Sequence, residues 1–413
     1  MKKTKLYKLS NGLKLVIHAD STRHSINANL ITLFGGINAS YLKDGKCHNI
    51  PSGVAHFLEH LLIEHSFKGN IYEYFSNRDV RFNGSTGNQS TNFFIDTVSD
   101  FDELLHDLIY MVNKAEFTPE DVDYTRKAVL EEVRKSDDNR FRQFSKVTRS
   151  CLFKNYTSEL PIGTLRDVSE MSYENLKLCH SLFYRPENQL LAITGNVKPD
   201  EIKKLVTDIY ASLDYKQLNV TSFIPDEDVS VAKESGELKW DTADEYVALN
   251  YKIDMSNYKP YDLLKLEYYI GFFLEYNFNE SSLAYDEVLT KKISNYSINF
   301  DSYILKNFFV ISIGCFTSDF SEFISIAEQK MKELFISEEY FNLLKNDAII
   351  KFLLREDGNT KVISAFVDNI LSIGYEKPDT IEDIENLSYL ECNEMLNKID
   401  FSNKCITKIV KEN

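Results

Sequence analysis

Two segments of this chain, 219 residues apart, carry the same succession of helix starts, and this repeat restricts the fold more than any other feature. Asp100-Phe101-Asp102-Glu103 and Asp319-Phe320-Ser321-Glu322 both have the acidic composition of a helix N-terminus. A second helix start follows each of them, at Thr118-Pro119-Glu120 and at Ser337-Glu338-Glu339, again 219 residues apart. The equal spacing, without a gap, predicts a duplicated domain.

The duplication predicts two domains, and a chain of 413 residues suits two domains better than one. We expect a first domain at 1–218, a linker at 219–237 and a second domain at 238–413. The expected linker contains Pro225-Asp226-Glu227-Asp228 and a Ser-Gly pair, which are residue types that interrupt helices and strands.

The first half alternates strand patterns with helix patterns. Asn11-Gly12 separates two strand-like segments, which predicts a β-hairpin. Apolar residues recur at helical spacing between Leu104 and Val112. The other expected elements are a strand at 25–34, a helix around 56–60, a short helix at 72–76, a strand pair at 80–97 and a helix at 198–213. This order predicts an α+β fold in which helices pack on mostly antiparallel sheets.

The segment His56-Phe57-Leu58-Glu59-His60 carries the clearest chemistry. Two histidines four residues apart project from one face of a helix and can bind one metal ion. His-x-x-Glu-His is the inverted form of the zinc-peptidase motif, and Glu59 lies close enough to act on a metal-bound water. The flanking Gly53-Val54-Ala55 and Leu61-Leu62-Ile63 indicate a buried helix, in which a polar face needs a compensating partner such as a metal.

A catalytic zinc takes three protein ligands and leaves one position for water, so a third ligand is expected elsewhere in the chain. We expect it on the helix that begins with Thr118 as its N-cap and Pro119 as its first residue. Glu132 shares a face of that helix with Val129, whereas Glu131 points about 100° away and is expected to face solvent. An ordinary surface acid is the alternative interpretation of Glu132.

With these segments in view, the chain resembles the pitrilysin/insulinase family of zinc peptidases (M16), in the half-length form that includes subunits of the mitochondrial processing peptidase. The matching blocks are 53–60, 83–86 with 91–94, 129–133, and 183–188 with 190–195. The resemblance covers the first half well and the second half by organisation only. It implies two homologous domains that form one half of a clamshell, with His56, His60 and Glu132 as zinc ligands and Glu59 as the general base.

Two departures accompany this resemblance. Family members often carry a further glutamate seven residues before the last ligand, and this chain has Thr125 there. In the second copy, Lys351 takes the place of Glu132, and no histidine follows His180. We therefore expect a second domain without a metal site.

The resemblance also implies how substrate and partner would bind. Phe82-Asn83-Gly84-Ser85-Thr86 resembles the edge strand to which an extended peptide adds, although an ordinary hairpin is the alternative. The opposing half of the family's enclosure commonly supplies an Arg and a Tyr. Here Tyr296 matches the tyrosine, but Leu289 or Thr290 occupies the arginine position. We therefore expect a heterodimer with a second M16-type subunit that supplies Arg and Tyr, with a homodimer as the main alternative.

The activity implied is zinc-dependent endopeptidase cleavage of short, unstructured peptides. Small paired bacterial members of the family are associated with removing leader peptides from ribosomally made peptides. A composition rich in Lys, Asn and Ile suits a low-GC bacterium, so leader removal is the expected role. The alternative is a catalytically silent peptide-binding or structural core subunit in which the zinc is structural.

Composition excludes several other classes. The net charge of −16 argues against nucleic-acid binding, because nucleic acids require a basic surface. No apolar segment approaches the length of a membrane span, and the N-terminus leads into strand-like sequence rather than a signal peptide. The six cysteines are scattered, without a Cys-x-x-Cys pair, so we expect a reduced, cytoplasmic protein without disulfides.

Overall fold

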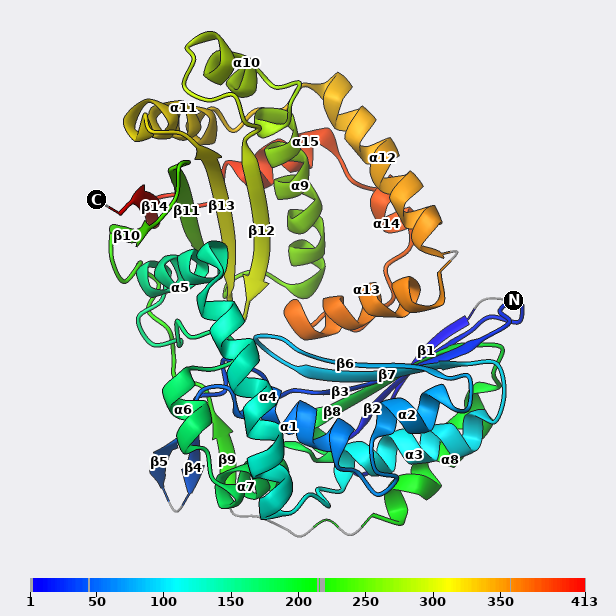
Figure 1. The fold of residues 1–413 in the computed structure, drawn as a ribbon. Helices are drawn as coiled ribbons and strands as arrows, with labels where there is room; N and C mark the ends of the chain where they lie inside the picture. Colours follow the sequence, from blue (N-terminus) through cyan, green and yellow to red (C-terminus); the bar gives the residue numbers. More distant parts are fainter. Residues whose placement is uncertain (1–2, 44, 214, 216–219, 357, 413) are drawn as a thin grey trace. The chain divides into compact units, whose positions relative to one another are not determined.

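A computed structural model describes residues 3–43, 45–213, 215, 220–356 and 358–412 (Figure 1). The chain divides into two compact units. The first comprises Met1–Asn139, Glu159–Pro225 and Gly358–Ser364, and the second comprises Arg140–Ser158, Asp226–Asp357 and Ala365–Asn413. The predicted boundary between residues 218 and 219 lies outside the described residues, and the predicted domain limits remain a prediction.

The first unit is built on a six-stranded sheet in the order β1-β2-β8-β3-β7-β6. Its strands are β1 (Lys3–Lys8), β2 (Lys14–Ala19), β3 (Ile26–Thr32), β6 (Arg81–Thr86), β7 (Thr91–Thr97) and β8 (Gln189–Gly195). All neighbours are antiparallel except β2 and β8. The predicted hairpin and strand pair are both present. Within the described chain, β6 pairs only with β7 and forms one edge of the sheet.

Helices α1, α2, α3 and α8 lie along the same side of this sheet (Figure 1). The helices of the unit are α1 (Val54–Glu64), α2 (Ile71–Ser76), α3 (Phe101–Asn113), α4 (Pro119–Asp137), α6 (Leu165–Glu170), α7 (Tyr173–Phe183) and α8 (Pro199–Ala211), with a 3-10 turn at Pro186–Asn188. A small sheet of β4 (Ser40–Lys43), β5 (Lys46–Asn49) and β9 (Val220–Phe223) completes it. None of the helices in the described part of the chain combines the length and apolarity needed to cross a membrane.

Local chemistry explains how the two key helices begin. Gly53 precedes α1 with φ of 87°, a left-handed conformation that favours glycine. A Cβ atom on Gly53 would also come within 2.9 Å of the Cα of Gly163. At α4, Thr118 is the N-cap and Pro119 occupies the first turn, as predicted, and Asp121 completes a reciprocal capping box with Thr118.

The second unit contains a five-stranded sheet in the order β10-β14-β11-β13-β12, antiparallel except for β10 and β14. Its strands are β10 (Ser235–Trp240), β11 (Tyr246–Asp254), β12 (Asn299–Leu305), β13 (Phe308–Phe316) and β14 (Lys404–Lys411). Its helices are α5 (Arg140–Leu152), α9 (Pro260–Phe278), α10 (Leu283–Thr290), α11 (Phe320–Glu333), α12 (Glu338–Glu356), α14 (Ile381–Glu385) and α15 (Tyr389–Leu396), and α13 (Asn359–Ser372) begins in the residues grouped with the first unit. The predicted α+β class is confirmed.

The repeat is visible in the helices. Helices α3 and α11 begin at Phe101 and Phe320, and α4 and α12 begin at Pro119 and Glu338, 219 residues later in both cases. Both α4 and α12 contain 19 residues. Lys351 on α12 forms an ion pair with Asp347 at 2.7 Å. The predicted duplication of a helix-on-sheet domain is therefore confirmed.

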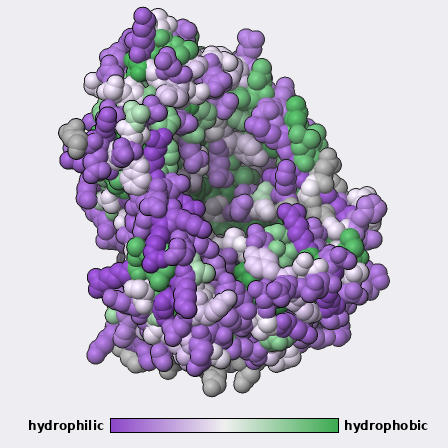
Figure 2. Space-filling view, viewed as in Figure 1, coloured by the Kyte–Doolittle hydropathy of each residue, from purple (hydrophilic) through white to green (hydrophobic). Residues whose placement is uncertain are grey.

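The outward faces of α4 and α12 differ in composition. Four apolar side chains of α12 are more than half exposed, and Figure 2 shows an apolar patch over this helix. They are Leu343, Ile350, Leu353 and Leu354. The positions 219 residues earlier on α4 carry Tyr124, Glu131, Arg134 and Lys135. The two helices therefore bury apolar residues at matching positions, such as Val129 and Ala348, but differ at these four exposed positions.

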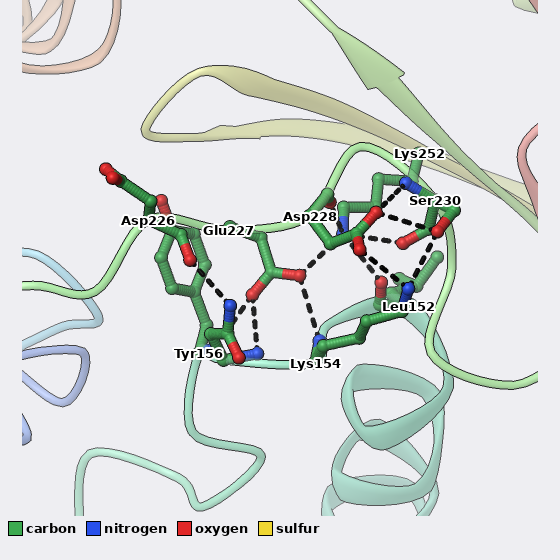
Figure 3. A network of polar contacts seen from close by, with 9 residues as sticks. Leu152, Lys154, Tyr156, Asp226, Glu227, Asp228, Ser230 and Lys252 are labelled. Carbon is green, nitrogen blue, oxygen red and sulfur yellow. Dashed lines mark hydrogen bonds and ion pairs between the residues drawn. The ribbon is translucent and has the colours of Figure 1, made fainter.

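A buried lysine anchors part of the predicted linker to the second unit (Figure 3). Lys252 on β11 donates hydrogen bonds to Glu227 Oε1 at 2.8 Å and to the carbonyl oxygens of Leu152 and Asp228 at 2.9 and 2.6 Å. Glu227 also accepts from the backbone N–H groups of residues 154–156. Burial lowers the pKa of Lys252, although Glu227 opposes this shift. Residues 226–230 are thus held against the end of α5.

Candidate active site

The two histidines of α1 and a glutamate of α4 converge in the first unit. His56 Nε2 lies 3.4 Å from Glu132 Oε2, and His60 Nε2 lies 3.5 Å from Glu132 Oε1. One ligand atom from each of the three residues lies within 4.8 Å of the others. Glu131, the neighbour that was expected to face solvent, is 63% exposed and pairs with Arg134.

The donor set fits a tetrahedral zinc ion. In a tetrahedral site, zinc–nitrogen and zinc–oxygen bonds of about 2.0–2.2 Å place neighbouring ligand atoms about 3.3–3.6 Å apart. The two nitrogen–oxygen distances, each to a different oxygen of Glu132, fall in this range, and both exceed the usual length of a hydrogen bond. The Glu132 side chain is 43% exposed, which leaves access for a water molecule as a fourth ligand.

Glu59 lies on α1 between His56 and His60, and it is buried, with a relative exposure of 8%. The Thr86 hydroxyl donates a hydrogen bond to Glu59 Oε2. Burial raises the pKa of Glu59, and Glu132 adds to the shift, whereas Thr86 and His60 oppose it. A carboxylate with a raised pKa has greater affinity for a proton, as a general base requires.

The absence of a side chain at Gly84 leaves room for the side chain of Glu59. A Cβ atom on Gly84 would lie 3.0 Å from Glu59 Oε1 and 2.8 Å from Ile63 Cδ1. The strand therefore packs directly against the candidate base.

The predicted substrate strand corresponds to β6, and its residues fall into two groups. Phe82 is buried and packs against Phe75, with ring centroids 5.1 Å apart. Asn83 and Ser85 are exposed, and Asn83 Oδ1 accepts a hydrogen bond from the Tyr72 hydroxyl at 2.9 Å. The side chains of Phe82 and Thr86 therefore serve the core and Glu59.

Sequence reasoning missed a set of residues behind His60. Glu64 Oε1 lies 3.2 Å from His60 Nδ1, and the Thr125 hydroxyl donates to Glu64 Oε2 at 2.9 Å. His65 Nε2 lies 3.0 Å from the Thr125 hydroxyl, and His65 Nδ1 lies 3.0 Å from Asp121 Oδ1. The spacing of four residues between His60 and Glu64 was the available signal, because such pairs are neighbours on a helix.

These contacts also shift the pKa values of Glu64 and His60. Partial burial alone would raise the pKa of Glu64, but hydrogen bonds from His60 and Thr125 outweigh it and lower the pKa. Burial alone would lower the pKa of His60, but Glu64 and Glu132 outweigh it and raise the pKa. The carboxylate of Glu64 and the ring of His60 thus interact as a pair.

In the second unit, Tyr296 is 49% exposed and its ring packs on Phe316 at 5.1 Å between centroids. Lys291, beside the position where an arginine was sought, forms ion pairs with Glu287 and Glu322 at 2.8 and 2.6 Å. Its charge is therefore already matched by two carboxylates of the same unit.

Known sequence families account for most of this chain. Residues 46–163 match the profile described as Insulinase (Peptidase family M16), and residues 170–347 match the profile described as Peptidase M16 inactive domain. The chain belongs to peptidase family M16. The first M16 profile spans His56, Glu59, His60 and Glu132.

One curated relative and one solved structure extend over nearly the whole chain. It is 26% identical over 395 residues to the "Uncharacterized zinc protease YmfH" of Bacillus subtilis, covering 92% of each protein. It is 28% identical over 274 residues to the "Zinc protease PqqE" of Helicobacter pylori, covering 61% of this chain and 57% of that one. The crystal structure of a putative M16-like peptidase from Alicyclobacillus acidocaldarius superposes with a TM-score of 0.87 at 18% identity, covering 100% and 99% of the two chains.

Proposed function

We propose that this protein is a zinc-dependent endopeptidase that hydrolyses short, unstructured peptides as the catalytic subunit of a heterodimer. The observation that carries the proposal is the convergence of His56, His60 and Glu132 at ligand spacing, beside the buried Glu59. Relatives that are named zinc proteases support it.

In the proposed mechanism, His56, His60 and Glu132 hold the ion. When bound, zinc lowers the pKa of a water molecule and polarises the scissile carbonyl. Glu59 accepts the proton of that water and delivers it to the leaving amine. Thr86 restrains Glu59 through its hydrogen bond to Oε2, so that the carboxylate keeps one orientation.

Substrate binds in this proposal as a strand added to β6. The strand lies at a sheet edge, so its outward N–H and C=O groups can pair with an extended backbone. Asn83 and Ser85 are exposed on the strand and accessible to substrate. Main-chain pairing selects for unfolded segments, which suits leader peptides of ribosomally made precursors.

The partner subunit would contribute an arginine, which this chain lacks at positions 289 and 290, together with a tyrosine. Tyr296 alone does not complete the pair, because Lys291 is already paired within its own unit. A cytoplasmic location is part of the proposal, supported by six free cysteines.

The deciding experiment is Glu59→Gln in the zinc-loaded protein, with its partner if one co-purifies. We expect zinc content to stay at the wild-type level and peptide hydrolysis to fall by about 10²–10⁴-fold. Glu131→Gln, an exposed residue of α4, is the matched control. Turnover by Glu59→Gln close to wild type would remove Glu59 as the base. A wild-type protein that binds zinc and peptide without cleavage would favour the silent, structural-zinc alternative.

A further inference from the structure

The ring of His60 is contacted on both sides by carboxylates. Glu64 lies one turn further along α1, and its Oε1 is 3.2 Å from His60 Nδ1. The other ring nitrogen, Nε2, faces Glu132 at 3.5 Å. A carboxylate at Nδ1 keeps the proton on that nitrogen, because a carboxylate only accepts hydrogen bonds. Nε2 then presents its lone pair to the metal position.

We propose that Glu64 is the positioning residue for His60, and that Thr125, His65 and Asp121 hold Glu64 in place. This inference rests on the proposed function, since it assigns His60 as a metal ligand. A ligating histidine that is oriented through its second nitrogen binds metal more tightly, because its tautomer and ring angle are set in advance.

The hydrogen-bond donors and acceptors behind Glu64 can be assigned by counting protons. Thr125 has one hydroxyl proton, which it donates to Glu64 Oε2. It can therefore only accept from His65 Nε2, 3.0 Å away. His65 Nδ1 lies 3.0 Å from Asp121 Oδ1. His65 therefore connects the Thr125 hydroxyl to the carboxylate of Asp121.

The network spans the two helices that carry the ligands. His60, Glu64 and His65 belong to or directly follow α1, whereas Asp121 and Thr125 belong to α4. Thr125 is fully buried, so its hydroxyl is a fixed point between the helices. The network therefore fixes the position of α1 relative to α4. Glu132 lies on α4, two helical turns beyond Thr125.

Position 125 is where family members often carry a glutamate. In this chain Thr125 stands at that position, and the carboxylate beside His60 Nδ1 is that of Glu64 on α1. The Thr125 hydroxyl is 2.9 Å from Glu64 Oε2, so a longer acidic side chain at 125 could occupy the same place once Glu64 is shortened. We therefore expect a carboxylate at position 125 to replace one that is removed from position 64.

The test is the zinc affinity of the full chain, measured by competition with a chromophoric chelator in the absence of substrate. We expect Glu64→Ala to weaken zinc binding by about 10–100-fold, and Glu64→Gln and Thr125→Val to weaken it less. The double variant Glu64→Ala/Thr125→Glu should recover at least part of the loss. Glu131→Gln, which is exposed on α4 and away from this network, should bind zinc like the wild type.

Melting temperatures of the metal-free variants control for folding, and Glu64→Gln, nearly identical in shape, keeps the test valid if Glu64→Ala is poorly folded. Zinc affinity within twofold of wild type for both Glu64 variants would overturn the proposal. A wild-type chain that binds no zinc would overturn the proposed function together with it. A chain that binds zinc but cleaves no peptide would refute only the peptidase, because the affinity comparison does not depend on turnover.

Discussion

The hydroxyl of Thr86, on the edge strand β6, donates a hydrogen bond to the buried carboxylate of Glu59 on α1. The strand proposed to bind substrate is thereby connected to the group proposed to accept the proton. A peptide that adds to β6 would lie along the same strand whose side chain orients the base. Binding and proton transfer would then share one structural element.

Thr86→Val tests this connection through pH. The hydrogen bond from Thr86 lowers the pKa of Glu59, against the larger effect of burial, so its loss should raise that pKa. Because Glu59 must be ionised to act, the acidic limb of kcat/KM should move to higher pH, with more activity lost at low pH than at high pH. The exposed Thr207→Val on α8 is the control, and an unmoved acidic limb would contradict the role of Thr86.

Gly84→Ala should impair catalysis more than binding. The added methyl group would press on Glu59 Oε1 and Ile63, displacing the base. We expect kcat to fall by about tenfold or more, with zinc content retained, because small displacements of a catalytic group are costly. Steady-state kinetics distinguishes this fall in kcat from weaker substrate binding, which would raise KM. Gly271→Ala on α9 is the matched control, since a Cβ atom there meets nothing within 4 Å.

Glu267 on α9 should make the protein less stable as pH rises. Burial, aided by Asp368, raises its pKa to about 7, whereas the unfolded chain titrates near 4.5. The folded state therefore binds more protons between these values, and stability is lost as pH increases through about 7. Glu267→Gln should raise stability by about 1–3 kcal/mol at pH 8 and by little at pH 4.5. Calorimetry at both pH values measures it, with Glu275→Gln as control; no pH dependence in the difference would refute the prediction.

Lys252→Met should destabilise the second unit. Its side chain and that of Glu227 are fully buried, so removing the cation leaves an uncompensated carboxylate, at a cost of about 3–5 kcal/mol. Adding Glu227→Gln should recover part of this loss. Denaturant titration of the single and double variants measures the coupling free energy between Lys252 and Glu227. Additive effects of the two substitutions would contradict this coupling. Zinc affinity should not change, because the ligands lie in the first unit.

The sequence was sufficient to predict those site residues whose placement depends on a single helix. His56 and His60 share a face because of helical periodicity, and the capping residues at Thr118 and Pro119 set the register of Glu132. The same logic identified both helix starts of the repeat. These features depend on local spacing along the sequence.

The contacts between elements could not be reached in this way. The sequence shows Thr125 only as a threonine where family members often carry a glutamate. Its hydrogen bonds with Glu64 and His65 depend on the packing of α1 against α4. Lys252 lies within a strand whose other residues are mostly apolar, and nothing in its neighbours indicates a buried partner at Glu227. Such pairs are far apart in sequence and depend on tertiary structure.

The repeat of α4 and α12 provides the molecule with its own internal reference. Both helices contain 19 residues and begin 219 positions apart, but Glu132 on one corresponds to Lys351 on the other. In a hydrogen-exchange experiment, zinc should slow exchange along α4 and leave α12 unchanged. Both helices experience the same temperature and salt in one sample, so a zinc-dependent change in α4 that α12 does not share reports metal binding within a single polypeptide.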